Sequence, residues 1–264
     1  MLASCRIERK IYSSLPVNNP SLQDKGDYSV SATISDPKGF DLNGGFAVTN
    51  RLALIAGAYT HKNKDIEESF VIGSQEDSSN LIYRHKGFTL GAGIFFPIFK
   101  KKPDSYLSFY SGINTGSFRM NEAYFEINPT PSVQRLNEYK SKLNRYFLQG
   151  SINYYGKSIE ASATTRFNLV EYKNVRTDYT NTQLSEYQLP PFVSHRLNSF
   201  VDFSTDLKVF FSNRPRWGIQ FFTLISTRTN EDDDPGFGNF YHYYPFRIGT
   251  GIFFRGFSGK GTGK

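Results

Sequence analysis

Residues 197–211 read LNSFVDFSTDLKVFF, and their side chains alternate between apolar and polar. The apolar positions are Leu197, Val201, Phe203, Leu207, Val209 and Phe211, and the polar positions are Asn198, Asp202, Ser204, Asp206 and Lys208. A period of two residues is typical of a β-strand whose two faces differ. The stretch therefore predicts a long strand with one apolar and one polar face.

The same alternation recurs along the chain from Asp27 onward. Residues 159–169 and 217–228 show it most clearly. We expect ten strands in all, near residues 28–35, 39–49, 51–61, 81–97, 105–119, 143–155, 158–172, 196–212, 216–229 and 243–257.

The connections between these strands are mostly short and long in turn. The short ones are residues 49–51, 99–104, 156–157 and 213–216, and the long ones are 62–80, 120–142, 173–195 and 230–242. Outer-membrane barrels have short periplasmic turns, longer extracellular loops and an even strand number. The sequence therefore predicts an all-β fold, a closed antiparallel up-and-down transmembrane β-barrel of about ten strands, within a range of about eight to twelve.

The composition agrees with such a barrel. Phe and Tyr, with 25 and 17 residues, raise the aromatic share to 16%, although hydrophobic residues make up only 38% of the chain. No run reaches the roughly 18 apolar residues of a transmembrane helix, which excludes a helical membrane protein. The alternation does not say which face lies inside. A soluble, lipocalin-like binder with an apolar interior therefore stays open as an alternative.

The charge pattern and the cysteine count exclude other classes. The net charge is +7, but Lys and Arg are scattered, whereas a nucleic-acid-binding protein usually gathers them in one stripe. We therefore expect no nucleic acid as a partner. One cysteine, Cys5, excludes a disulfide framework and a thiolate metal site.

The N-terminus carries a candidate lipidation site. Leu2-Ala3-Ser4-Cys5 looks like a bacterial lipobox, although the basic and apolar regions of a signal peptide do not precede it. Cys5 is thus either acylated or an incidental residue, and we expect acylation. Residues 1–25 contain Pro16 and Pro20 without periodicity and predict an extended tether. The expected order is this tether, a barrel over residues 26–257 and a flexible basic tail over 258–264, with both termini in the periplasm.

A family resemblance covers about residues 16–60. It rests on Pro16, Pro20, Leu22, Lys25-Gly26 and the stretch GFDLNGGFAVTNRLALIAG, residues 39–57. These residues resemble a poorly characterised family of outer-membrane β-barrel proteins and lipoproteins of the Bacteroidota. The hairpin at residues 46–50 is the strongest match, while Asn43 stands where Gln is usual and Asp27 where Glu is. The resemblance implies location and fold, not chemistry.

The last predicted strand contains a second resemblance. Its residues Arg247, Gly249, Ile252 and Phe254 look like the signal by which the barrel-assembly machinery recognises a closing strand. Unlike many such barrels, this chain continues past the signal.

The polar face of the predicted strands is rich in charge. We expect a network of barrel-interior residues that comprises Arg145, Glu160, Arg166, Asp202, Asp206, Lys208 and Arg228. These side chains either line a narrow pore or pair with one another in a plug. Small barrels near eight strands are filled by side chains, so a filled interior is favoured.

No pattern in the sequence indicates catalysis. His61, His85, His195 and His242 have no metal-site spacing, and Ser194-His195 lacks a nucleophile motif around it. The acidic run at residues 231–234 could attract calcium but lacks an EF-hand alternation. The prediction is no enzyme, no cofactor and no metal.

These observations predict a non-catalytic barrel in the bacterial outer membrane. We expect a structural or accessory subunit of a larger outer-membrane complex for barrel assembly, secretion or import. The alternatives are a narrow pore or small-ligand-binding barrel and the soluble binder. The expected partners are outer-membrane lipid, lipopolysaccharide and other outer-membrane proteins.

Overall fold

The computed structural model describes residues 9–10, 12–69, 77–99, 104–126, 133–186, 189, 197–211, 216–229 and 243–257. One helix, α1, spans Asn181–Glu186. The strands are β1 (Tyr12–Ser13), β2 (Tyr28–Asp36), β3 (Gly39–Ala47), β4 (Leu52–Ser69), β5 (Asp77–Pro97), β6 (Ser105–Glu126), β7 (Val133–Tyr155), β8 (Ile159–Thr177), β9 (Leu197–Phe210), β10 (Arg216–Arg228), β11 (Tyr243–Tyr244) and β12 (Phe246–Gly256).

Ten of these strands form a closed antiparallel barrel, which confirms the predicted fold class and strand number. The order is β10-β12-β2-β3-β4-β5-β6-β7-β8-β9, and β9 pairs back with β10. The last strand, β12, pairs with both β2 and β10 and so completes the wall. Arg247, Gly249, Ile252 and Phe254 all lie on this strand. The short strands β1 and β11 pair with each other in parallel and are not part of the wall.

The apolar face of the strands points outward. Exposed side chains include Leu54, Leu90, Leu148, Phe203 and Ile252, whereas the polar alternate positions are buried inside. A closed barrel with an apolar outside and a polar interior is the arrangement of a transmembrane β-barrel. The soluble alternative with an apolar interior is therefore wrong. Among the described residues, no helix is long and apolar enough to cross a membrane.

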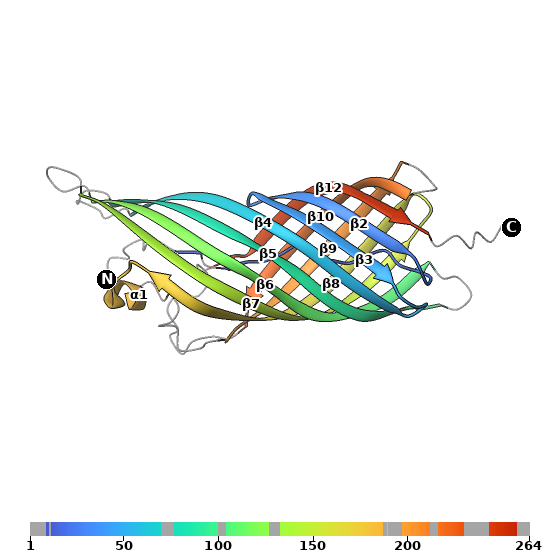
Figure 1. Cartoon of the computed structure of the whole chain (residues 1–264). Helices are drawn as coiled ribbons and strands as arrows, with labels where there is room; N and C mark the ends of the chain where they lie inside the picture. Colours follow the sequence, from blue (N-terminus) through green and yellow to red (C-terminus); the bar gives the residue numbers. More distant parts are fainter. Residues whose placement is uncertain are drawn as a thin grey trace.

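The barrel is extended at one end. Strands β4 to β8 are 18 to 23 residues long, whereas about 9 to 11 residues cross a bilayer. Figure 1 shows these strands continuing well beyond the shorter ones, toward the end that carries α1. We call this end the loop end and the opposite one the turn end. Parts of the expected long loops are therefore strand, and the sequence hides this because their outer face turns polar.

The segment before β2 is not outside the barrel. Residues 12–27 run through the lumen, and Arg9 is buried against Glu122 near the loop end of β6. At the turn end, Asp27 is buried beside Arg255 of β12. The described chain thus begins with Arg9 at the loop end and ends with Phe257 at the turn end. The expectation that both termini are periplasmic stays a prediction, because residues 1–8 and 258–264 are not described. Cys5 and the basic tail lie outside the described residues.

The barrel lumen as the candidate functional site

The N-terminal segment, of which residues 9–10 and 12–27 are described, is the main occupant of the lumen. Its contacts follow the barrel from the loop end to the turn end in chain order: Arg9 with Glu122, Ser13 with Arg247, Leu15 with Arg166, Asn18 with Gln149, Ser21 with Glu160 and Asp27 with Arg255. Each of these wall residues comes from a strand far away in sequence. The segment therefore fits the interior along its whole length.

Glu122 binds the segment at the loop end. Its carboxylate accepts a hydrogen bond from Arg9 Nη2 at 2.5 Å and another from Ser79 Oγ at 2.7 Å. Tyr179, which follows β8, donates its hydroxyl to the same carboxylate. Burial, and then the nearby Glu122 carboxylate, raises the pKa of Tyr179, so its proton stays in this bond. Leu184 of α1 packs in the apolar cluster beside Tyr179 and helps to cover this end of the lumen.

Tyr12 fixes the next part of the segment by aromatic contacts. Its ring stacks on Phe200 of β9, with ring centroids 3.7 Å apart and an interplanar angle of 7°. The Arg145 guanidinium lies 4.8 Å from the Tyr12 ring centroid, within the range of a cation–π contact. Arg145 Nη2 also donates to the Ser13 carbonyl oxygen at 3.0 Å. The cation is thus used to hold the segment.

Asp202 is the hub of the central lumen. One of its carboxylate oxygens accepts from Arg166 Nε at 3.0 Å and Nη2 at 2.7 Å, and the other accepts from Ser226 Oγ at 2.6 Å. Asn168 adds a further bond at 2.8 Å. The same Arg166 donates to the carbonyl oxygen of Leu15. Because the ion pair is oriented by these bonds, it presents a fixed donor to the segment.

Asn18 binds the wall on the turn-end side of Asp202. The Asn18 amide donates to the carbonyl oxygens of Gly44 and Ala56 at 3.0 and 2.8 Å. Gln149 donates to the Asn18 carbonyl oxygen at 3.0 Å. In an open lumen these carbonyl and amide groups of the wall would bind water, but here they form hydrogen bonds with Asn18.

Arg255 organises the turn end. Its guanidinium donates to Glu160 Oε1 at 2.7 Å, to Gln23 Oε1 at 2.7 Å and to Asp27 Oδ2 at 3.4 Å. Ser21 donates to the other Glu160 oxygen, and Lys208 donates to Ser21 Oγ at 3.1 Å. Arg216 Nη1 also lies 3.6 Å from Glu160 Oε1, so three cations and two carboxylates lie together in this cluster around the segment.

The predicted interior residues all turn toward the lumen but do not form one network. Arg166 pairs with Asp202, and Asp206 accepts from Gln220. The remaining members contact other groups, Arg145 with Ser13, Glu160 with Arg255, Lys208 with Ser21 and Arg228 with Asn198. Four of the seven contact the N-terminal segment, which was expected to be only a tether: Arg145, Glu160, Arg166 and Lys208.

Two central residues were missed as interior groups. Arg247 and Arg255 are fully buried, at 0% exposure. Arg247 was assigned only to the closing-strand signal, yet its guanidinium donates to Ser35 Oγ at 2.8 Å and Ser13 Oγ at 2.5 Å. On β12, Arg247 and Arg255 lie at odd positions, whereas the outward residues Ile248, Ile252 and Phe254 lie at even positions. The period of two therefore predicts that both arginines point into the barrel.

The described histidines, His61 and His85, are both buried in the barrel. His61 Nε2 lies 2.9 Å from Asp41 Oδ1, and the same ring contacts the Arg247 guanidinium. His61, Asp41 and Arg247 are all buried. His85 packs against Phe118, with ring centroids 4.6 Å apart. Among the described residues, no group of three or more His, Cys, Asp or Glu could hold a metal ion. Ser194, His195, His242 and the acidic run 231–234 lie outside the described residues.

Comparison with known proteins gives barrels at low similarity. No family model and no curated protein matches the chain. The outer membrane protease OmpT from Escherichia coli is 9% identical, with a TM-score of 0.48, and the alignment covers 87% of this chain and 90% of that chain. CarO from Acinetobacter baumannii is 10% identical, with a TM-score of 0.30 over 86% and 96% of the two chains. The NanC porin is 9% identical, with a TM-score of 0.28 over 86% and 98%.

Proposed function

We propose that this chain is a non-catalytic barrel of the bacterial outer membrane whose lumen is closed by its own N-terminal segment. The observation that carries the proposal is the continuous set of contacts from Arg9 to Asp27. In this role the barrel is a structural or accessory subunit of a larger outer-membrane complex rather than a solute pathway.

One small cavity lies beside the segment in the central lumen. A cavity of about 20 Å³ remains between Asn18, Tyr59 and Arg166. This volume holds about one water molecule. The bonds of the segment also occupy the charged groups that a pore would need for selecting a solute. The lumen therefore supports a plugged scaffold over the alternative of a narrow pore.

The plug also bears on the orientation of the chain. We infer that the loop end faces the outside of the cell, because outer-membrane barrels carry their longer loops there. Arg9 would then lie at the outer end of the lumen, and Phe257 at the periplasmic end. Antibody labelling of intact cells through an epitope placed after Cys5 tests this topology, and labelling only after permeabilisation contradicts it.

Planar-bilayer recording tests the plug. We expect the purified full chain to show no conductance steps, because the segment fills the lumen. A variant lacking residues 6–20 should show them, since it keeps the turn-end contacts of Ser21 and Asp27 but opens the rest. Heat-modifiable migration on a gel checks that both barrels are folded. Steady conductance of the full chain would overturn the proposal.

Isolation from the native membrane tests the accessory role. Mild-detergent extraction with a tag on the C-terminus should recover the barrel in a complex larger than itself. The control is the same extraction with a second, unrelated outer-membrane barrel carrying that tag. Recovery of this chain alone would contradict the accessory role and leave the plug unaffected.

A further inference from the structure

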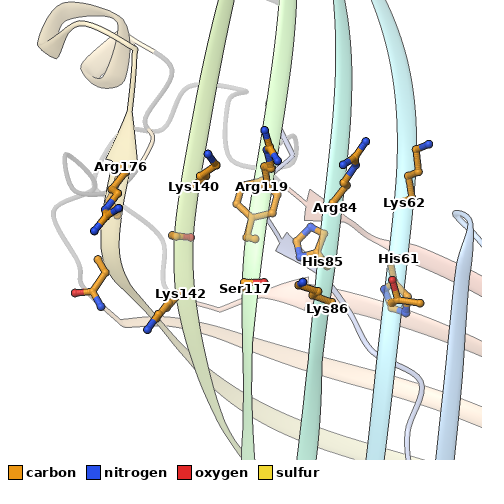
Figure 2. Close-up of a pocket in the computed structure, with 15 residues that line it drawn as sticks. His61, Lys62, Arg84, His85, Lys86, Ser117, Arg119, Lys140, Lys142 and Arg176 are labelled. Atoms are coloured by element: carbon orange, nitrogen blue, oxygen red, sulfur yellow. The ribbon is translucent and has the colours of Figure 1, made fainter.

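The outer surface near the loop end carries a row of cations. Lys62, Arg84, Arg119, Lys140 and Arg176 are direct cross-strand neighbours on β4, β5, β6, β7 and β8. A second row, one step closer to the turn end, contains Lys86, Lys142 and Lys173. Figure 2 shows the side chains of both rows from β4 to β8, except for that of Lys173. We call these eight residues the basic rows.

Among the described residues, the carboxylates beside the two rows are too few to neutralise them. Glu138 binds both Arg119 and Lys140, and Glu171 lies 2.9 Å from Lys173. Within the described part of the chain, Lys62, Arg84, Lys86, Lys142 and Arg176 form no ion pair. Like charges directly opposite each other on neighbouring strands are destabilising. Such an arrangement calls for anions from outside the chain.

The position of the basic rows relative to the apolar belt indicates how deep in the bilayer such anions would lie. Phe88 lies two residues from Lys86 on the outer face of β5, about 7 Å along the strand. Leu90, Ile113 and Tyr146 follow as the exposed apolar belt of the same wall. The basic rows thus border the belt at the depth where lipid headgroups begin. Their surface forms a groove of about 760 Å³ lined by residues of five adjacent strands.

We infer that the basic rows bind the phosphate groups of a phosphorylated glycolipid in the outer leaflet, the chemical class to which lipopolysaccharide belongs. Lys and Arg bind phosphate through charge-assisted hydrogen bonds, and Arg can do so with two parallel bonds. The acyl chains would lie on Leu90, Ile113 and Tyr146 below. The inference rests on the proposed function for its orientation, since it needs the loop end at the outer leaflet.

The test compares two triple variants of equal charge change. In the first, Lys62→Gln, Arg84→Gln and Arg176→Gln remove cations that lack a described ion pair. In the second, Lys25→Gln, Arg51→Gln and Lys157→Gln remove exposed cations at the turn end. Native mass spectrometry in detergent then measures retention of purified bis-phosphorylated lipid A by each protein. The same lipid without its phosphates, and inorganic phosphate as competitor, complete the experiment.

We expect the first triple variant to retain at least about tenfold less lipid A, because each basic residue near an anionic surface contributes separately to the binding free energy. The turn-end variant should bind like the unchanged protein, and dephosphorylated lipid should bind poorly to all three. Equal loss in both variants would show a mere net-charge effect, and full competition by equimolar inorganic phosphate would show a free-phosphate site. Either outcome overturns the inference.

Failure of this inference is distinguishable from failure of the proposed function. The first triple variant changes none of residues 9–27, and the second changes only the exposed Lys25 among them, so both keep the described lumen contacts and should stay silent in bilayer recordings. Conductance of the unchanged protein would overturn the plug whatever the lipid result. Removal of like charges from one row should leave folding intact, which heat-modifiable migration checks.

Discussion

Replacing Asp202 with Leu should destabilise the barrel by about 3–5 kcal/mol, because Arg166 would stay buried as an unpaired charge. The change also removes the acceptor of Ser226 and Asn168. The double variant Asp202→Leu with Arg166→Met should be less destabilised than Asp202→Leu alone, since it leaves no uncompensated charge. Denaturant unfolding in detergent, monitored by the loss of the folded band on a gel, measures the stability of all the variants.

An exposed ion pair provides the control. Glu171→Gln removes the partner of Lys173 on the outer face, and exposed pairs contribute only about 0.2–1 kcal/mol. We expect this variant to unfold close to the unchanged protein. If Asp202→Leu behaves in the same way, the Asp202 hub does not hold the segment and the lumen is more hydrated than the contacts indicate.

Replacing Gly45 with Val should displace the N-terminal segment. A Cβ at Gly45 would lie 2.4 Å from Cβ and Cγ of Pro20, so the inner wall and the segment could not both keep their places. Inserting methyl groups into a packed interior costs about 1–3 kcal/mol. Hydrogen exchange measured on peptides from residues 12–23 should rise, because displaced backbone loses its bonds in the lumen.

The neighbouring glycine is a matched control. A Cβ at Gly44 would meet only Ser29 O at 3.4 Å and Val30 Cγ2 at 3.8 Å, which are ordinary contacts. Gly44→Val also adds the same atoms to the same strand, but on the lipid side of the wall. Exchange in residues 12–23 should therefore stay as in the unchanged protein. Equal exchange in both variants would mean that Pro20 does not lie against the wall at Gly45.

The barrel could be predicted from the sequence because its walls repeat one simple signal. Along residues 197–211 every second side chain is apolar, and this period directly reflects a two-faced strand. The extensions of β4 to β8 could not be predicted in the same way. Their outer face carries residues such as Lys62, Arg84 and Arg119, so the hydropathy contrast between the two faces disappears although the pairing of the backbones continues.

The occupant of the lumen could not be predicted from period or composition. Residues 12–27 form almost no regular structure, and their partners Arg166, Glu160 and Arg255 lie more than 130 residues away in sequence. The charges of the inner face were visible in the sequence, but not that carbonyl and hydroxyl groups of a coil segment would satisfy them. Arg247 shows the same difficulty, because nothing in the pattern of the last strand indicates that its side chain binds Ser13 of the segment.

The threaded segment sets an order of events for biogenesis. Residues 9–27 directly precede β2, and the wall is complete only when β12, nearly the last described part of the chain, pairs with β2. The chain that fills the lumen is therefore made first, and the seam that encloses it is made last. Insertion into a bilayer must accommodate a hydrophilic chain between strands that are still open, or pull that chain through a finished ring. Any assembly catalyst for this protein therefore handles a barrel together with the hydrophilic chain that fills it.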